Sequence, residues 1–475
     1  MNAPFYGRER EIRLLRERLE MKIASLIVIK GRRRIGKSRL AEEFAKSLKT
    51  IQIEGLPPDD EAITAQSQRT HFATCLQREV GLRGLKAEDW DDLFWHLAEA
   101  TKKGRVVIVL DEINWMGSKD PTFLGKLKTA WDRYFKKNPQ LICILSGSMS
   151  GWIEKNILSG TGFLGRISLD LTLEELPLFE CNHFWRPFEN RISSFEKFKI
   201  LSVTGGIPRY LEEIDPKIPA EEMIYRLCFR REGLLFSEFD RIFSDLFSRR
   251  APSYKKIVMR LADGDADLSQ ICQALQVEKG GLMSEYLTDL EETQYIQRYN
   301  GWNLKDGKRL KTSRYRLKDN YLRFYLKYIE PHADAIVRGR LKKVPAWDAI
   351  LGLQFENLVV NHCKQLYSLL KIPLDQIIRD GPYRQRQTKL HRGCQIDYLL
   401  QLQYNSLYLC EIKYSSKPIG IEIVEEVQEK MHRLSHPKVC FSIRPVLIHV
   451  NGVSDALLEN SFFTHIIDFS QFLVR

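Results

Sequence analysis

A glycine-bearing loop between an apolar run and a helical pattern constrains this chain more than any other feature. The apolar run is Leu26–Ile29, and it leads into the sequence GRRRIGKS. This is the GxxxxGK[ST] pattern in the strand–loop–helix setting of a phosphate-binding loop. Gly31 and Gly36 let the backbone N–H groups face phosphate at a helix N-terminus. Lys37 is predicted at the β- and γ-phosphates and Ser38 on Mg²⁺. The predicted nucleotide-binding residues of the loop are Gly31, Arg32, Arg33, Arg34, Ile35, Gly36, Lys37, Ser38 and Arg39.

A second apolar run ends in two carboxylates, as a nucleotide hydrolase requires. Val106–Leu110 has the composition of a strand buried on both faces, and Asp111 and Glu112 follow it. We expect Asp111 to bind Mg²⁺ and Glu112 to act as the catalytic residue that polarises the attacking water. A strand ending in Asp-Glu is common, but its place downstream of the phosphate loop makes the prediction specific.

Further strand-like runs at Thr50–Ile53, Leu141–Leu145 and Ile167–Leu171 complete a mostly parallel sheet with helices on both faces. Arg166 comes directly before the run Ile167–Leu171, which would place this arginine at the mouth of the sheet. We expect Arg166 to reach the γ-phosphate, within the chain or across a subunit interface, and the alternative is an ordinary surface arginine. Ser146, at the end of the preceding strand, is predicted near the γ-phosphate.

Composition narrows the class of protein. The 475 residues carry a formal net charge of +12, and the nine cysteines are scattered with no CxxC pair. That cysteine usage argues against a disulfide framework and a zinc ribbon. No apolar run approaches the roughly 20 residues that cross a bilayer, and the first residues lack a signal-peptide core. We therefore expect a cytoplasmic protein without membrane contact, whose basic excess either serves nucleic acid or merely solvates the surface.

The middle of the chain shows three helical patterns and then two alternating runs. The helices are predicted at Tyr254–Leu261, Asp267–Leu275 and Gly281–Thr293, and the strands at Tyr295–Tyr299 and Thr312–Leu317. Three helices followed by a two-stranded ribbon are typical of a winged helix-turn-helix.

The charge of this segment favours contact with DNA phosphates. Residues 298–318 hold eight Lys or Arg and one acidic residue, Asp306, which suits a basic wing. The predicted recognition helix is acidic, however, so reading of base sequence is not expected. The alternative is a module that packs on the ATPase as a rigid transmission element.

The last third contains a spaced set of carboxylates. Asp397, Glu411 and Lys413 lie in two strand-like runs and match D-x(n)-ExK. Glu411 and Lys413 share one strand face, since side chains alternate along a strand. Two carboxylates bind Mg²⁺ or Mn²⁺, which stabilises a phosphodiester transition state, and Lys413 would orient the water. A basic approach over residues 371–392 provides a track for a nucleic-acid backbone, and residues 349–366 are predicted to form one long helix.

Five motifs together resemble those of a known family. Three are the phosphate loop, the Leu-Asp-Glu run and Gly165-Arg166. The other two are FYGRE at residues 5–9 and TGGIPRYL at residues 204–211. The chain resembles the archaeal-type P-loop ATPases, an AAA/STAND-like branch with a C-terminal PD-(D/E)xK nuclease-like domain. The resemblance places Gly206 and Pro208 in a helical lid that senses nucleotide. It also implies Glu356 as a helix-borne acid of the nuclease core, with Gln428 a weaker candidate. The residues that it places beside adenine are Tyr6, Gly7 and Arg8.

The predicted fold class is α/β, in four parts. Residues 1–173 form the P-loop ATPase core with its parallel sheet, 174–248 the helical lid, 249–330 the winged helix-turn-helix, and 331–475 an α/β restriction-endonuclease-like domain.

The expected function is a Mg²⁺-dependent ATPase switch that uses ATP and is coupled to a DNA-binding, DNA-cleaving domain with its own Mg²⁺ or Mn²⁺ site. The alternative is a signalling ATPase with an inert nuclease-like module. A DNA motor is disfavoured, because no helicase motif set is present. A homo-oligomeric ring would need Arg166 to act across subunits, whereas a monomeric switch would not.

Overall fold

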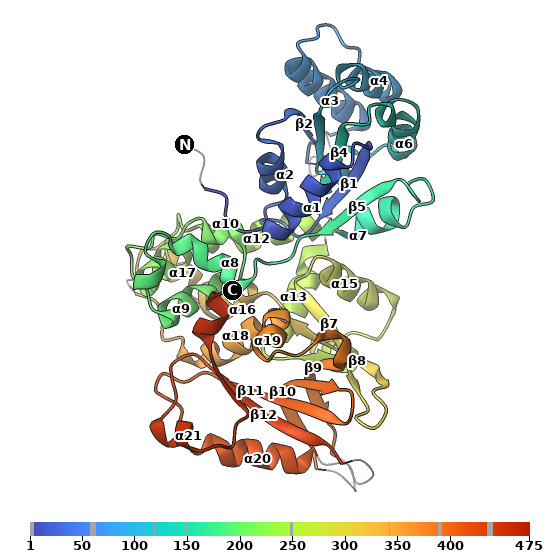
Figure 1. Ribbon diagram of the computed structural model, residues 1–475. Helices are drawn as coiled ribbons and strands as arrows, with labels where there is room; N and C mark the ends of the chain where they lie inside the picture. The colour runs from blue at the N-terminus through green and yellow to red at the C-terminus, as the bar shows by residue number, and fades with distance from the viewer. Residues whose placement is uncertain are drawn as a thin grey trace. The chain divides into compact units, whose positions relative to one another are not determined.

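The computed structural model describes residues 4–57, 63–117, 119–148, 150–247, 250–341, 343–387, 392–434 and 440–475 (Figure 1). The chain divides into two compact units. The first comprises Met1–Glu175 with Ser244–Arg249 and Glu292–Gln294, and the second comprises Leu176–Phe243, Arg250–Glu291 and Tyr295–Arg475. Within the described ranges, no helix combines the length and the apolar character that crossing a bilayer demands.

The first unit is built on a five-stranded parallel sheet in the order β2-β3-β4-β1-β5. The inner strands β1, β3 and β4 are buried along their whole length, which explains their continuous apolar sequences. All five strands predicted from the sequence are confirmed. Their bounds are β1 (Ser25–Lys30), β2 (Lys49–Glu54), β3 (Val106–Asp111), β4 (Leu141–Gly147) and β5 (Ile167–Thr172).

Helices cover both faces of this sheet (Figure 1). The helices of the first unit are α1 (Glu9–Glu20), α2 (Lys37–Ala45), α3 (Ala65–Val80), α4 (Trp90–Ala100), α5 (Ile113–Met116), α6 (Phe123–Arg133) and α7 (Ser150–Ile153). On one face, α3, α4 and α6 bring together an aromatic cluster in which the Trp90 ring lies 5.2 Å from Phe72 and 4.7 Å from Phe123. Such large buried rings contribute a major part of the apolar area that this unit removes from water.

The second unit begins with helices, in agreement with the helical pattern predicted for residues 174–248. They are α8 (Leu178–Cys181), α9 (Ser194–Thr204), α10 (Pro208–Leu211), α11 (Ala220–Cys228) and α12 (Leu234–Phe247). The domain limits predicted at residues 173, 248 and 330 remain predictions.

The three helices and two strands predicted in the middle of the chain are confirmed. They are α13 (Ala251–Ala262), α14 (Leu268–Leu275), α15 (Gly281–Glu292), β7 (Ile296–Trp302) and β8 (Arg309–Leu317). The structure adds a two-residue strand, β6 (Ala266–Asp267), which pairs with β8 to give an antiparallel sheet in the order β6-β8-β7. Helices α16 (Asn320–Phe324) and α17 (Ala333–Val337) follow.

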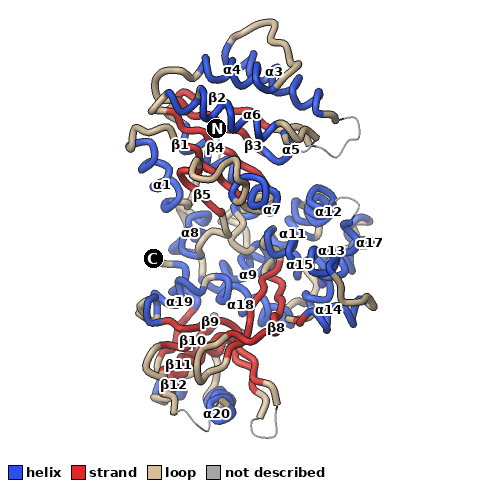
Figure 2. Tube along the Cα trace, turned by 90° about the vertical axis from the view of Figure 1, so that its right-hand side faces the viewer, coloured by secondary structure: helices blue, strands red, loops and turns tan. Residues whose placement is uncertain are grey.

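A second five-stranded sheet, in the order β13-β12-β11-β10-β9, carries the C-terminal carboxylates. Strands β9, β10 and β11 are antiparallel, whereas β11, β12 and β13 are parallel. Figure 2 shows β9, β10, β11 and β12 with α20 beside them. The bounds are β9 (Ile377–Gln385), β10 (Cys394–Leu402), β11 (Ser406–Lys413), β12 (Ser442–His449), β13 (His465–Asp468), α18 (Asp348–Asn361), α19 (Cys363–Leu369), α20 (Ile423–Arg433) and α21 (Asp455–Glu459).

The single long helix predicted for residues 349–366 is wrong, because α18 and α19 are separate helices. His362 breaks the pattern with φ −110° and ψ 32°. Its ring nitrogens lie 2.7 Å from the Leu358 carbonyl oxygen and 3.1 Å from that of Leu176, so tertiary contacts hold the break.

Two glycines of the second unit provide a test of this packing. A Cβ at Gly233 would lie 2.4 Å from the Leu227 carbonyl oxygen, whereas a Cβ at Gly352 on α18 would meet nothing within 4 Å. We expect Gly233→Ala to lower the free energy of unfolding by about 2 kcal/mol, and Gly352→Ala to raise it by about 0.5–1 kcal/mol. Denaturant unfolding of both variants measures the difference, and equal effects would contradict this packing.

Candidate functional site

The predicted phosphate loop joins β1 to α2 and has the backbone that its glycines allow. Gly36 has φ 89° and Arg34 has φ 68°, and a Cβ at Gly31 would lie 2.7 Å from the Leu173 carbonyl oxygen. Lys37 is buried, and its Nζ donates to the carbonyl oxygens of Gly31 at 3.0 Å and Arg32 at 3.2 Å. Burial lowers the pKa of Lys37, and the carboxylates of the acidic pair oppose that shift. The lysine therefore lies inside the loop that it is predicted to serve.

The acidic pair at the end of β3 is held by hydroxyl groups from two other elements. Asp111 accepts a hydrogen bond from the Ser38 Oγ at 2.6 Å on one carboxylate oxygen and from the Ser146 Oγ on the other. Glu112 accepts from the N–H of Ser148 at 3.0 Å and from its Oγ at 2.7 Å. The structure thus brings together the serine and the carboxylate predicted as Mg²⁺ ligands. Hard oxygen donors of this kind suit Mg²⁺.

Glu112 has an unusual backbone conformation. Its φ of 48° and ψ of 50° lie in the left-handed region, which a non-glycine residue adopts at a cost of about 1–3 kcal/mol. This residue also precedes the short helix α5, so the chain turns sharply directly after the strand. The turn aims the carboxylate at the tip of β4.

Two residues near this pair were not found by sequence reasoning. Glu54 ends β2 opposite Asp111 in the strand register, and burial together with the carboxylates of Asp111 and Glu112 raises its pKa. The side chain of Asn114 is buried, and its amide atoms have no hydrogen-bond partner among the described residues. Glu54 was detectable as an acid at the end of a strand, whereas nothing in the sequence marks Asn114.

Arg8 reaches the phosphate loop from the N-terminal segment. Its Nη2 donates to the carbonyl oxygens of Ile35 at 2.9 Å and Glu174 at 2.6 Å, and the side chain is buried. Gly7 and Arg8 both have positive φ, at 75° and 61°, so the chain turns just before α1. The adenine contact of Tyr6, Gly7 and Arg8 stays a prediction.

The arginines of the loop differ in their surroundings. Arg32 is buried, and its Nη1 lies 3.8 Å from Glu175 Oε1. Arg33, Arg34 and Arg39 are partly exposed. Arg39 lies 3.6 Å from Glu42 on the same helix.

Arg166 makes a bidentate ion pair with Asp132 on α6. The Arg166 Nε donates to Asp132 Oδ1 at 3.0 Å and the Nη2 to Oδ2 at 2.8 Å, and this pairing holds the pKa of the Asp132 carboxyl well below its usual range. The arginine-finger role of Arg166 stays a prediction. In the second unit, the carbonyl oxygen of Gly206 accepts from the Leu176 N–H at 2.8 Å, and Pro208 begins α10. Their role as nucleotide sensors also stays a prediction.

The C-terminal carboxylates meet where β10 and β11 diverge. The β10–β11 ladder ends at the pair Tyr398 and Cys410, and beyond it Asp397 Oδ2 accepts a hydrogen bond from the Ile412 N–H at 2.9 Å. Glu411 is buried and forms an ion pair with Lys430 of α20.

The lysine of the predicted motif also contacts α20. Lys413 Nζ lies 2.9 Å from Glu426 Oε2. Glu426 and Lys430 are four residues apart on α20, so one face of that helix supplies partners to both members of the ExK pair. Gln428 is exposed. Sequence reasoning missed Lys430, although the spacing of Glu426 and Lys430 was available as a signal.

The pKa values of three carboxyl groups are raised by burial and by the charges of neighbouring acids. Burial, and then the charge of Glu356, raises the pKa of Asp397 to about 6. Burial, and then the charge of Asp397, raises the pKa of Glu411 to about 7. Glu356, on α18, has its own pKa raised chiefly by burial. These shifts place the sequence-predicted acids close enough for each to disfavour ionisation of the next.

A metal at this place would need ligands beyond the protein. Across the described ranges, no group of three or more His, Cys, Asp or Glu side chains is arranged to hold an ion. Mg²⁺ usually binds through one or two carboxylates with water and phosphate oxygens completing the shell. The chemistry of Asp397 and Glu411 fits that mode.

Comparison with known proteins gives a family match for the first part of the chain. Residues 5–214 match the model of an ATPase domain predominantly from Archaea. An uncharacterized protein of Methanocaldococcus jannaschii, MJECL04, is 26% identical over 434 residues, which are 91% of this chain and 92% of that protein.

A solved structure supports the fold. The Walker-type ATPase PABY2304 of Pyrococcus abyssi aligns with a TM-score of 0.52 and 19% identity over 68% of this chain and 96% of that one. Residues 5–214 therefore match an ATPase domain of the archaeal type, which is consistent with ATP as the ligand, and the solved structure supports the fold.

The raised carboxyl pKa values predict how stability depends on pH. Asp397 has a pKa near 6 in the folded protein and about 3.9 when unfolded, so the folded state binds its proton more tightly. The contribution of this group to the free energy of unfolding should fall as the pH rises from 4 to 7, by up to about 3 kcal/mol. In chelator-containing buffer, Asp397→Asn should therefore be more stable than wild type at pH 8 and equal to it at pH 4.

Asp306→Asn serves as the matched control, because that carboxyl is exposed and its pKa is lowered. It should not gain stability at pH 8. If Asp397→Asn is no more stable than wild type at pH 8, the buried, mutually repelling arrangement of the acids is wrong.

Proposed function

We propose that this chain is a Mg²⁺-dependent ATPase switch coupled to a nucleic-acid-binding unit that cleaves phosphodiester bonds. The ATPase half rests on the family match over residues 5–214. The observation that carries the second half is the arrangement of Asp397 and Glu411 at the ends of β10 and β11, where Asp397 accepts the Ile412 N–H and Lys430 of α20 pairs with Glu411. The raised pKa values of both carboxyl groups agree with this arrangement. Perturbed acids that converge from different elements are typical of a site built for chemistry.

In the ATPase half, each proposed role follows from the contacts of the residue. Lys37 binds the β- and γ-phosphates, and Ser38 and Asp111 hold Mg²⁺. Glu112 orients the attacking water, and its hydrogen bonds to Ser148 fix the carboxylate before nucleotide arrives. Arg166 is proposed to contact the γ-phosphate, for which it would have to leave Asp132.

In the second half, Asp397 and Glu411 are proposed to hold a Mg²⁺ or Mn²⁺ ion. When bound, such an ion neutralises charge on the phosphate and lowers the pKa of an attacking water. Lys413 orients that water, and Lys430 favours the ionised form of Glu411 against the effect of burial. The mixed sheet supports this arrangement, because β10 and β11 present their carboxylates at one end of the sheet, beside α18.

The β7–β8 hairpin is proposed as the DNA contact of a winged helix formed by α13, α14, α15, β7 and β8. Four of its basic side chains are exposed near its tip: Lys305, Lys308, Arg309 and Lys311. Exposed cations at a hairpin tip suit contact with backbone phosphates and give affinity that falls with salt. The domain limits at residues 173, 248 and 330 belong to this proposal.

One observation favours the second candidate, a regulatory ATPase with an inert C-terminal module. Both carboxylates already have protein partners, since Glu411 pairs with Lys430 and Asp397 accepts the Ile412 N–H. In that case Glu411→Ala would leave function unchanged, whereas a working nuclease would lose cleavage.

The ATPase roles predict two distinct losses. Lys37→Ala should abolish both ATP binding and turnover, because the buried cation inside the loop is gone. Glu112→Gln should retain binding and lose turnover by about 100-fold or more, since only the orientation of water suffers. Equilibrium binding of labelled ATP and phosphate release separate the two, and equal loss of binding in both variants would refute the assignment of Glu112.

The nuclease role predicts metal-dependent nicking that Asp397→Ala abolishes. Purified protein is incubated with Mg²⁺ or Mn²⁺ and ATP on single- and double-stranded DNA and RNA. Lys37→Ala in the same assay reports whether cleavage depends on the ATPase, and Asp334→Ala, at an exposed position on α17, controls for loss of an acidic charge. If wild-type protein leaves every substrate intact, the cleavage proposal fails and the regulatory candidate stands.

A further inference from the structure

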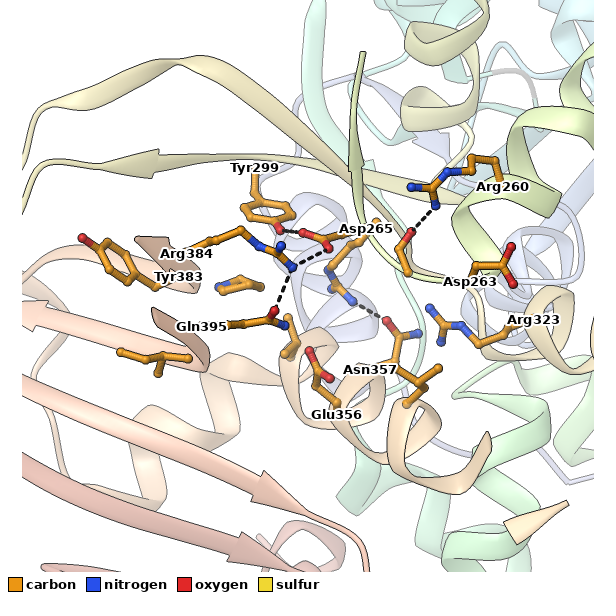
Figure 3. Close-up of a pocket in the computed structure, with 16 residues that line it drawn as sticks. Arg260, Asp263, Asp265, Tyr299, Arg323, Glu356, Asn357, Tyr383, Arg384 and Gln395 are labelled. Atoms are coloured by element: carbon orange, nitrogen blue, oxygen red, sulfur yellow. Dashed lines mark hydrogen bonds and ion pairs between the residues drawn. The ribbon is translucent and has the colours of Figure 1, made fainter. Parts of the chain in front are cut away.

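A pocket with a volume of about 340 Å³ lies within the second unit, walled by α13 and the β7–β8 hairpin on one side and by α18, β9 and β10 on the other (Figure 3). Apolar and aromatic groups form part of the wall, among them Tyr299, Tyr383 and Ile396. Four arginines also line it: Arg260, Arg316, Arg323 and Arg384. A cavity of this size, in which charged and amide side chains stand beside aromatic and apolar groups, has the character of a site for a polar ligand.

Two of these arginines are buried with neutral partners only. Arg316 donates from Nε to Gln297 Oε1 at 2.8 Å and from Nη2 to Asn361 Oδ1 at 2.5 Å, and it also bonds Asn357. Arg323 donates to Gln354 Oε1 at 3.0 Å. Neither forms an ion pair with a carboxylate of the described residues, although each is less than a tenth exposed.

Arg323 leaves part of its guanidinium unsatisfied. Its Nε is buried and has no hydrogen-bond partner among the described residues. A buried cation without an anion is costly, and the cost falls when an anionic ligand arrives. Among the described residues, the two arginines of the inner wall therefore have hydrogen bonds to neutral groups but no direct ion pair.

The acids of the pocket form no ion pair with either buried arginine. Asp265 is engaged by Tyr299, by Arg314 Nε at 2.7 Å and by Arg384 Nη2 at 3.4 Å, and Asp263 pairs with Lys327. Glu356 interacts electrostatically with both buried arginines and with Asp397. Glu356 thereby connects the pocket to the proposed cleavage site.

We propose that this pocket receives one unpaired nucleotide of a nucleic-acid strand, with a phosphate at Arg316 and Arg323 and the base against Tyr299 and Tyr383. The inference rests on the proposed function and names its substrate class: strands with a single-stranded end or gap. A base pair is too large for the pocket, whereas a single base stacks on tyrosine and contributes about 1–3 kcal/mol. The Tyr383 ring is fixed for this role, because it packs edge-on against Trp302 at 5.1 Å.

The test measures binding without cleavage. Fluorescence anisotropy in chelator-containing buffer compares a labelled blunt duplex with the same duplex carrying a short single-stranded thymidine tail. We expect the tailed duplex to bind about tenfold more tightly, in line with the stacking of one or two bases. Thymidine monophosphate is the third probe, and binding of the mononucleotide without any preference for the tail would overturn the proposal.

Two exposed wall residues supply the variants, because Arg316→Gln would break three core hydrogen bonds and test folding as well. Leu353, 42% exposed on α18, is changed to Trp to fill the pocket without altering charge. Arg384→Gln removes one cation of the wall. The matched control is Arg338→Gln, an exposed arginine outside the pocket.

Both wall variants should lose most of the preference for the tail, and Arg338→Gln should retain it. Equal affinity of wild type for blunt and tailed duplexes, or a preference that survives Leu353→Trp, would overturn the proposal. Neither result depends on nicking. A protein that cleaves DNA but shows no tail preference would refute the pocket alone, and one that binds tails but never nicks would refute the cleavage proposal alone.

Discussion

The Asp111 carboxylate organises the nucleotide-binding half of this protein. Through one oxygen it is bonded to Ser38, at the start of α2, and through the other to Ser146, near the end of β4. Three segments that are distant in sequence thus converge on a single side chain at the carboxyl end of the inner strand β3. Because the carboxylate is almost completely buried, each of these hydrogen bonds is shielded from water and constrains its donor more than a surface bond would. The phosphate loop, the acidic pair and the tip of β4 consequently form one structural unit.

Much of the nucleotide-binding half could be predicted from the sequence, because its signals are local. Each signal spans only a few residues: the apolar runs of strand length, the glycine loop and the two acids after β3. All five strands lie where the apolar runs predict them. The same holds for α13 to α15 and for β7 and β8, whose period and breaks are visible in the chain.

What the sequence could not supply are the partners that only folding brings together. Asp132 lies on α6 and pairs with Arg166, and Lys430 lies on α20 and pairs with Glu411. The spacing of Glu426 and Lys430 marks one face of α20, but neither pairing follows from the sequence, since each depends on where the helix packs. His362 is a similar case, because its contact with the Leu176 carbonyl oxygen ends a helix that local propensity would continue. The C-terminal carboxylates were recognisable as candidates, but their mutual repulsion and their partners on α20 required the sheet.

The strand order of the first sheet has a consequence for how the protein is made. The phosphate-loop strand β1 lies between β4 and β5, which are the last two strands of that sheet in the chain. During synthesis from the N-terminus, the first strand therefore has neither of its neighbours until residue 147 has left the ribosome, and it lacks the second neighbour until residue 172 has followed. Pairing over so long a separation costs loop-closure entropy and slows folding. The nascent chain must keep this apolar strand from misassociating throughout that interval, and the nucleotide site is completed only when the whole sheet closes.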